Sequence, residues 1–345
     1  MNLSQFGHSK YSENISYINF NQDSSGFLIT TPNGLTIFQI DPLEMKFNLS
    51  ELGPIKFAEM FFQASLVTYV SEKEPTVATL FHILENRKIV DITQSEEIIW
   101  MGQNQKRLII CTKSSIEFYD IKKLSHLGSI EEKNENTKFA FSSNDKSLFG
   151  FSHEKDGGYV SIFDALHMKK LFTVKCHKTQ ISTLSFDQES TVFATTSITG
   201  TLVRIFEVES PHNPLKEFRR GTQKANVYST AFSYDTSFLC LSSDHGTLHI
   251  FKFKKKSTET KESQGNFQAL TQKLSSGKAF AYCSHGIKIP HICSFMFQKV
   301  NEVVVIGCDG RVKIYQFNVE KGGECKLITD NNFFLAIDEK KDKKK

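Results

Sequence analysis

Two short hydroxyl-bearing turns and one arginine pair are the residues in this sequence whose types and spacing best suit binding chemistry. The motif Ser-x-x-Gly-Thr occurs at Ser197–Thr201 and again at Ser243–Thr247. Between the two copies, residues 218–221 read Phe-Arg-Arg-Gly. A guanidinium group carries a planar fork of N–H donors that suits phosphate, and hydroxyl groups can add further hydrogen bonds. The combination predicts paired anion-binding sites.

The two arginines can serve different sites because consecutive side chains of an extended chain point to opposite sides. We therefore expect Arg219 to serve the site near the first motif and Arg220 the site near the second. Gly221 lets the backbone turn or approach a ligand closely. The alternative is a solvated pair, or one bound to nearby carboxylates, which is usual for an isolated Arg-Arg. The duplicated motif on either side favours the anion sites.

The elements that position these residues belong to a repeat that runs through the chain. A short strand ending in an aromatic residue recurs seven times, at Phe38, Phe81, Phe118, Phe163, Phe206, Phe251 and Tyr315. Another apolar strand and a turn precede each of these strands, and a third strand precedes the pair. Repeats of about 40 to 45 residues with several strands are typical of propeller blades. The predicted fold is all-β, a seven-bladed, WD40-like β-propeller; a helical repeat is disfavoured because the alternation has period two.

Blades five and six differ from the others at one position, two residues before the aromatic residue. Blade five has Arg204 there and blade six has His249. The remaining blades have, in chain order, Thr36, Thr79, Ile116, Ser161 and Lys313. Two adjacent blades thus each combine hydroxyl groups with a cationic or hydrogen-bonding side chain.

The sixth interval between aromatic residues is the longest, at 64 residues against 37 to 45 for the others. Its excess lies at about 254–281, where Phe267, Leu270 and Leu274 have the spacing of a short amphipathic helix. We expect this loop of blade six to insert into a membrane; the alternative is that it folds back onto the propeller. The predicted organisation is one propeller over residues 1–335 and a basic disordered tail over 336–345.

Bulk composition argues against several functional classes. The net charge of +4 is too small to argue for nucleic acid. Seven scattered cysteines without CxxC spacing predict reduced thiols in a cytoplasmic protein. The sequence carries no metal-ligand spacing, Gly-rich phosphate loop, HExxH or nucleophile elbow, which predicts neither enzyme nor cofactor. The sequence shows no signal peptide and no membrane-spanning run, so we expect any membrane contact to be peripheral. We also expect the protein to be a monomer.

Residues 218–221, followed by 227–253, resemble the PROPPIN family of phosphoinositide-binding β-propellers, which includes the WD-repeat proteins interacting with phosphoinositides. The resemblance is sharpest over residues 177–253, and the blade rhythm extends it over most of the chain. Residues 317–325 resemble the smaller, short-looped branch of the family. The resemblance implies binding of phosphatidylinositol 3-phosphate and phosphatidylinositol 3,5-bisphosphate, without catalysis, at two rim sites in autophagy.

The resemblance also implies the residues of each site. The first site would use His177, Lys178, Ser197, Thr201, Arg204 and Arg219. The second would use Arg220, Ser242, Ser243, Thr247 and His249. By general frequency, a histidine such as His177 is more often a structural hydrogen-bonding residue, and the resemblance reverses that interpretation.

The resemblance further implies a location and a partner. The protein would lie on preautophagosomal, endosomal or vacuolar/lysosomal membranes, with an autophagy lipid-transfer protein as its partner. The alternative function is a WD40-type protein-interaction scaffold without lipid binding. That alternative explains the blades but leaves the duplicated motif unexplained.

Overall fold

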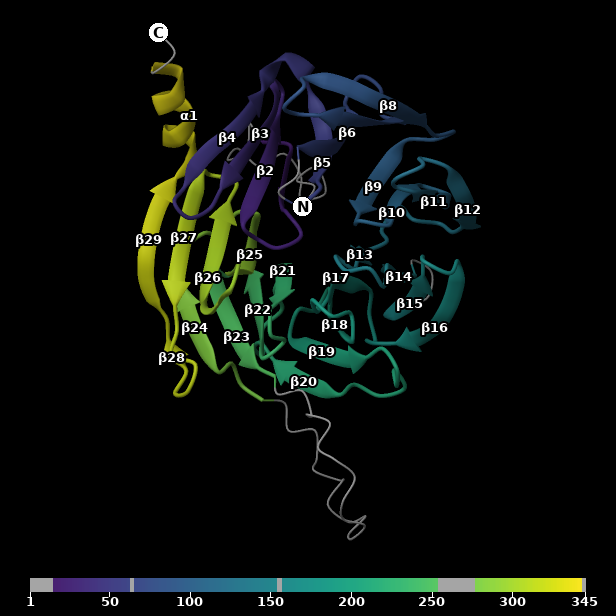
Figure 1. The fold of residues 1–345 in the computed structure, drawn as a ribbon. Coiled ribbons are helices and arrows are strands. Elements are labelled where there is room, and N and C mark those ends of the chain that lie inside the picture. Colours follow the sequence, from purple (N-terminus) through teal and green to yellow (C-terminus); the bar gives the residue numbers. More distant parts are fainter. Residues whose placement is uncertain (1–14, 63–64, 154–156, 254–276, 343–345) are drawn as a thin grey trace.

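Seven β-sheets form a ring in the computed structural model, which describes residues 15–62, 65–153, 157–253 and 277–342 (Figure 1). Six of the described sheets have four strands and one has five. Neighbouring strands within each four-stranded sheet run antiparallel, and in all but one of these sheets they also follow one another directly in the chain. The predicted seven-bladed β-propeller is confirmed.

The first four blades each use four consecutive strands. Blade one consists of β1 (Tyr17–Phe20), β2 (Gly26–Thr31), β3 (Gly34–Gln39) and β4 (Glu44–Leu49), and blade two of β5 (Ile55–Met60), β6 (Leu66–Ser71), β7 (Val77–His82) and β8 (Arg87–Thr93). Blade three consists of β9 (Ile98–Gln103), β10 (Arg107–Thr112), β11 (Ser115–Asp120) and β12 (His126–Glu131), and blade four of β13 (Phe139–Phe141), β14 (Leu148–Ser152), β15 (Tyr159–Asp164) and β16 (Lys169–Lys175). A short 3-10 helix, η2 (Ser50–Leu52), joins the first blade to the second.

The last three blades contain the residues of interest. Blade five consists of β17 (Ile181–Phe186), β18 (Val192–Ser197), β19 (Leu202–Glu207) and β20 (Lys216–Arg219). Blade six has β21 (Val227–Phe232), β22 (Phe238–Ser243), β23 (Thr247–Lys252) and β24 (Ala281–Ser284), and blade seven has β25 (His291–Met296), β26 (Lys299–Gly307), β27 (Arg311–Gln316) and β29 (Lys326–Asn332). Blade six gains a fifth strand, β28 (Gly323–Glu324), which pairs with β24 in parallel. Since β28 lies between β27 and β29 in the chain, it ties blade seven to blade six.

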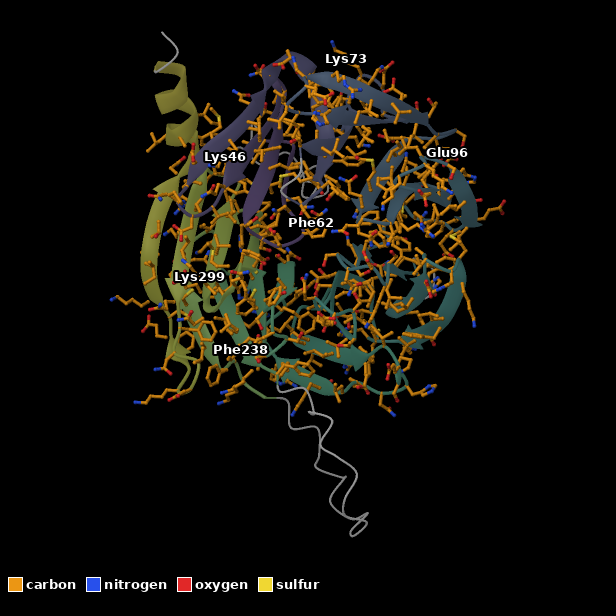
Figure 2. All side chains as sticks on the ribbon, viewed as in Figure 1. Lys46, Phe62, Lys73, Glu96, Phe238 and Lys299 are labelled. Carbon is orange, nitrogen blue, oxygen red and sulfur yellow. The ribbon has the colours of Figure 1, made fainter. Side chains whose placement is uncertain are left out.

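The repeating aromatic residues all lie in the third strand of their blades and are buried in the core. Several stack on a partner from the second strand; Phe206, for example, lies 5.3 Å from Phe193 between ring centroids. Side chains fill the space between neighbouring sheets around the ring (Figure 2). The aromatic residues also belong to core clusters that span neighbouring blades, as Phe206 does with Val160 and Ile162 of blade four. A large apolar side chain at this position therefore helps to hold each blade to its neighbour, which is why the sequence repeats it.

Among the residues that the structure describes, the ring closes by packing rather than by exchange of a strand. Blade one is built from β1 to β4 and blade seven from β25, β26, β27 and β29, so neither borrows a strand from the other. Their side chains share one core cluster that includes Phe27, Phe38 and Val304. Phe333 joins this cluster from the start of helix α1 (Phe333–Asp342), with its ring 5.3 Å from that of Phe38. Residues 336–342 of the predicted basic disordered tail, 336–345, lie within this helix.

The first strand of every blade lines a central cavity of about 1050 Å³. Glu59 of β5 lies in its wall and accepts hydrogen bonds from the Tyr17 hydroxyl, at 2.6 Å, and from the Asn19 amide, at 2.9 Å. Burial raises the pKa of Glu59 to about 7, although the hydrogen bond from Tyr17 opposes the shift. Among the described helices, none has the length and apolar character needed to cross a bilayer.

Candidate functional site

The two Ser-x-x-Gly-Thr motifs form the same backbone turn. The Gly200 N–H donates to the Ser197 carbonyl at 2.8 Å, and the Gly246 N–H donates to the Ser243 carbonyl at 3.0 Å. Both glycines have left-handed φ angles, of 63° and 70°, which glycine adopts without a steric penalty. A Cβ at Gly200 would also collide with the carbonyl oxygen of Ala225.

Strand register makes Arg204 and His249 equivalent positions, as the spacing from the aromatic residue predicts. Arg204 of β19 lies opposite Thr195, and His249 of β23 lies opposite Leu241, each two residues before the motif serine. The motif threonines are not equivalent, because Thr247 begins β23 whereas Thr201 precedes β19. The hairpin of blade five is therefore one residue longer than that of blade six.

At the first predicted site, the structure brings His177 and Arg204 together. His177 is buried, and its Nε2 donates to the carbonyl and hydroxyl oxygens of Thr195, at 3.2 and 3.1 Å. Arg204 donates to the carboxylate of Glu217 at 2.7 Å and to the carbonyl of Cys176 at 2.6 Å. Burial, with a smaller contribution from the charge of Arg204, lowers the pKa of His177 to about 4. His177 is therefore neutral at physiological pH.

The remaining residues of the first predicted site are more loosely held. Ser197 shares a hydrogen bond of 2.8 Å with the hydroxyl of Thr199. Lys178 and Arg219 are exposed, and neither forms a salt bridge within the described parts of the chain. The backbone N–H of Arg219 donates to the carbonyl of Gly277 at 3.0 Å. Arg219 thus has a fixed backbone and a side chain open to solvent.

At the second predicted site, Arg220 is 8% exposed and firmly held. Its guanidinium group donates to the carbonyls of Gly200 and Gln223, and one nitrogen lies 3.5 Å from Nδ1 of His245. Burial first, and then the nearby charge of Arg220, lowers the pKa of His249 to about 4. Arg220 is therefore close enough to His249 to act on it electrostatically, while its hydrogen bonds go to Gly200, Gln223 and His245.

Hydroxyl groups complete the second predicted site. The Thr247 hydroxyl shares a hydrogen bond of 3.2 Å with Nε2 of His249. The hydroxyl oxygens of Ser242 and Ser243 are both buried, and neither has a partner at hydrogen-bond geometry among the described residues. Ser242 lies beside the thiol of Cys293. The two serines are equally buried, and only Ser243 belongs to the repeated motif.

Sequence reasoning missed Glu217 and His245. Glu217 lies directly opposite Arg204 in the β19–β20 pairing, a register that only the folded sheet specifies. His245 occupies a variable position of the second motif, and its contact with Arg220 depends on the turn between β22 and β23. Side chains alternate between the two faces of a strand, so Glu217 shares a face with Arg219. This alternation is a sequence signal that could have pointed to Glu217.

The membrane-loop prediction concerns Phe267, Leu270 and Leu274, which lie outside the described residues. The described chain resumes at Gly277, which forms a bridge with Phe218 beside the arginine pair. The loop therefore returns to the propeller next to the predicted binding residues.

Comparison with known proteins identifies the family. The PROPPIN family model matches residues 14–279. Autophagy-related protein 18 of Dictyostelium discoideum is 30% identical over 95% of this chain and 96% of its own length. WD repeat domain phosphoinositide-interacting protein 2 of Mus musculus is 29% identical over 95% of this chain and 79% of its own length.

Solved structures agree on the fold. Kluyveromyces lactis Hsv2 with its complete loop 6CD has a TM-score of 0.80 at 18% identity, over 92% of this chain and 99% of that one. KlAtg21 in complex with the coiled coil of AgAtg16 has a TM-score of 0.78 at 21% identity, over 92% and 99%. At these identities the structural likeness shows the fold alone, and the sequence matches carry the assignment. This chain belongs to the PROPPIN family.

Proposed function

We propose that the protein is a non-enzymatic phosphoinositide-binding scaffold that is recruited to membranes in autophagy. The observation that carries the proposal is geometric: neighbouring blades five and six place Arg204 and His249 at the same register position, and the pair Arg219-Arg220 lies between the two blades. The printed names of the relatives, "autophagy-related" and "phosphoinositide-interacting", support the same function.

The ligands are phosphatidylinositol 3-phosphate and phosphatidylinositol 3,5-bisphosphate, each held through its phosphate groups. The first site consists of His177, Lys178, Ser197, Thr201, Arg204 and Arg219. Arg204 is preorganised by Glu217 and the Cys176 carbonyl, and the exposed Lys178 and Arg219 add mobile positive charge. Fixed and mobile cations together suit a charged group that arrives from solvent.

The second site consists of Arg220, Ser242, Ser243, Thr247 and His249. Its buried guanidinium group acts strongly on a bound anion, because the burial that fixes it also reduces screening by solvent. The unpartnered Ser243 hydroxyl and the Thr247–His249 pair offer hydrogen bonds to a phosphate group.

Two sites on one rim favour a membrane over a soluble ligand. Once one lipid is bound, binding of the second becomes intramolecular, and avidity can add about two orders of magnitude. The loop with Phe267, Leu270 and Leu274 inserts into the bilayer and slows release. It returns at Gly277 beside Arg219, on the same part of the rim.

The protein acts as a monomer on preautophagosomal, endosomal or vacuolar/lysosomal membranes, with an autophagy lipid-transfer protein as partner. The four blades remote from the arginine pair remain available for proteins. The alternative is a WD40-type protein-interaction scaffold without lipid binding. The two functions can be told apart because only the phosphoinositide-binding scaffold would bind membranes in a phosphoinositide-dependent way.

Liposome flotation tests the proposal. Wild-type protein should float with vesicles that contain phosphatidylinositol 3-phosphate, and Arg219→Thr with Arg220→Thr should not. The matched control is Arg87→Thr with Lys88→Thr, which removes an equally adjacent, exposed basic pair from β8 of blade two. Equal flotation of wild type and the Arg219/Arg220 variant would refute lipid binding at this site and favour the protein scaffold.

A further inference from the structure

A pair of facing side chains recurs where the third strand of a blade meets its outer strand. Thr79 of β7 lies opposite Asp91 of β8, and its hydroxyl donates to that carboxylate at 2.8 Å. Ser161 of β15 lies opposite Thr173 of β16, with 2.6 Å between their hydroxyl oxygens. Strand register therefore brings these two positions into contact in blades that carry different side chains there.

In blade five this pair consists of Arg204 and Glu217. Glu217 of β20 lies opposite Arg204 of β19 and accepts from its Nε–H, with 2.7 Å between the nitrogen and the oxygen. The side chains of Arg204 and Glu217 are 25% and 19% exposed, so solvent screens their attraction only in part. Arg204 therefore enters the first predicted site with a fixed negative charge beside it.

Blade six differs at the same position. His249 of β23 lies opposite Tyr282 of β24, and the ring of His249 shares a hydrogen bond with Thr247 instead. A carboxylate near the second predicted site, that of Asp244, comes from the turn and accepts from the Asn226 N–H at 3.1 Å. An acidic partner on the outer strand thus distinguishes the first site from the second.

The hydrogen bonds of Arg204 leave part of its guanidinium group for a ligand. Its Nε–H is bound to Glu217, and its Nη1 donates to the Cys176 carbonyl at 2.6 Å. Its Nη2 has no partner at hydrogen-bond geometry in the part of the chain that the structure describes. A phosphate group that bound Nη2 would share one guanidinium group with Glu217 and lie within about 7 Å of that carboxylate.

A carboxylate in this place acts differently on different head groups. A phosphate monoester carries a charge of about −1.5 to −2 at neutral pH, and a second one on the same inositol ring about doubles the total. Repulsion by Glu217 grows in proportion to that charge, whereas its hydrogen bond to Arg204 serves both head groups alike. The exposed Lys178 and Arg219 attract both head groups and oppose this repulsion. Glu217 therefore penalises a bisphosphate more than a monophosphate.

We propose that Glu217 is a specificity-determining residue of the first site, which positions Arg204 and disfavours a head group with a second phosphate. The inference rests on the proposed function and adds to it the residue by which the first site discriminates between the two lipids. Because the second site has Tyr282 in the equivalent place, the two sites of one rim differ in selectivity.

Calorimetric titration with soluble short-chain phosphatidylinositol 3-phosphate and phosphatidylinositol 3,5-bisphosphate tests the proposal. All proteins carry His249→Thr, which weakens the second site and introduces the residue that blades one and two have at this position. In that background, Glu217→Gln keeps a hydrogen-bond acceptor for Arg204 but removes the charge. We expect affinity to rise about threefold for the monophosphate and about tenfold for the bisphosphate.

The matched control is Glu209→Gln, which makes the same change of net charge in blade five. Glu209 is exposed and follows β19 at the end remote from the motif turn. It should leave the ratio of the two affinities unchanged. Glu217→Asp, which keeps the charge, should also preserve that ratio.

The outcomes separate this proposal from the function on which it rests. An equal change for both lipids in Glu217→Gln, no change, or a loss for both would overturn it, because a purely structural contact serves both head groups alike. The proposed function would stand in each of those cases. If neither lipid binds, or if both bind equally well to the Arg219/Arg220 variant, the proposed function fails and this inference falls with it.

The Nε–H resonance of Arg204 shows whether the contact survives in each variant. The hydrogen bond to Glu217 protects this proton from exchange with solvent, and the signal is assigned by its loss in Arg204→Lys. It should persist in Glu217→Gln and disappear in Glu217→Ala. Its disappearance in Glu217→Gln would mean that the substitution acts on the position of Arg204 rather than on charge, which would contradict the proposal.

Discussion

Arg219 and Arg220 are adjacent in the chain but differ in their surroundings. The guanidinium group of Arg220 is buried and satisfies the carbonyls of Gly200 and Gln223, whereas the side chain of Arg219 is exposed. The alternation of an extended strand explains the difference, because β20 ends here with one face on the core and the other on solvent. Arg220 therefore has a structural role in addition to its proposed role in binding.

Single substitutions should separate the two arginines in stability. Arg220→Thr leaves two carbonyls without their donor and should lower the free energy of unfolding by about 1 to 3 kcal/mol. Arg219→Thr removes an exposed side chain and should change it by less than about 0.5 kcal/mol. Urea unfolding followed by circular dichroism measures both values, and equal losses would contradict the difference in burial.

At the scale of the element, the turn between the second and third strands positions the candidate residues. Its glycine has a positive φ in blades five, six and seven, and the chain leaves the turn in the register that aligns Arg204, His249 and Lys313. The outer strand then supplies a carboxylate in blades five and seven. A glycine turn with the same hydrogen bond thus serves three blades, with different side chains attached.

Alanine at the turn glycines tests this view of the hairpin. Gly200→Ala combines a left-handed φ with a collision against the Ala225 carbonyl, and we expect a loss of about 2 to 4 kcal/mol. Gly221→Ala meets nothing within 4 Å and should be neutral or stabilising by up to about 1 kcal/mol. Thermal unfolding of the two variants side by side is sufficient, and similar melting temperatures would argue against the strain.

At the scale of the whole molecule, the propeller buries several ionisable groups in the forms that burial favours. Burial is the first cause that lowers the pKa of four histidines, to about 3 for His285 and about 4 for His177, His249 and His291. Glu59, in the wall of the central cavity, has its pKa raised to about 7. At mildly acidic pH the four histidines lower the stability of the folded protein, whereas Glu59 raises it.

Stability should fall as the pH drops from about 6.5 to 4.5. In that window the unfolded chain protonates the four histidines while the folded protein does not, so each histidine contributes a loss of up to about 1.4 kcal/mol per pH unit. Glu59 acts in the opposite direction, because between its ordinary pKa and about 7 the folded protein binds its proton more tightly. One carboxyl cannot offset four imidazoles, although His249 is partly exposed and contributes less.

Glu59→Gln provides the test of this balance. Removing the opposing carboxyl should steepen the loss of stability on acidification, as measured by urea unfolding at several pH values between 4.5 and 7. An unchanged pH slope would show that Glu59 is not protonated more readily in the folded protein than in the unfolded chain.

Much of the fold was predictable because its signals are local. The seven aromatic residues, the alternation of strand residues and the glycine turns each follow from steric and burial requirements within about ten residues of chain. The outermost strands gave weaker signals because they are largely exposed, as in β8 and β16. Strand β28 was not predictable, since its pairing joins residues 281–282 to residues 323–324.

By itself, the sequence determined the blade number, the duplicated motif and the arginine pair between its two copies. Only the tertiary structure decided which side chains meet: Arg204 with Glu217, Arg220 with His245, and His285 with His291. These contacts depend on register between strands and on the packing of one blade against the next. Turn geometry sets the register within each blade, whereas the packing between blades is set by the assembled ring, which no local stretch of sequence encodes.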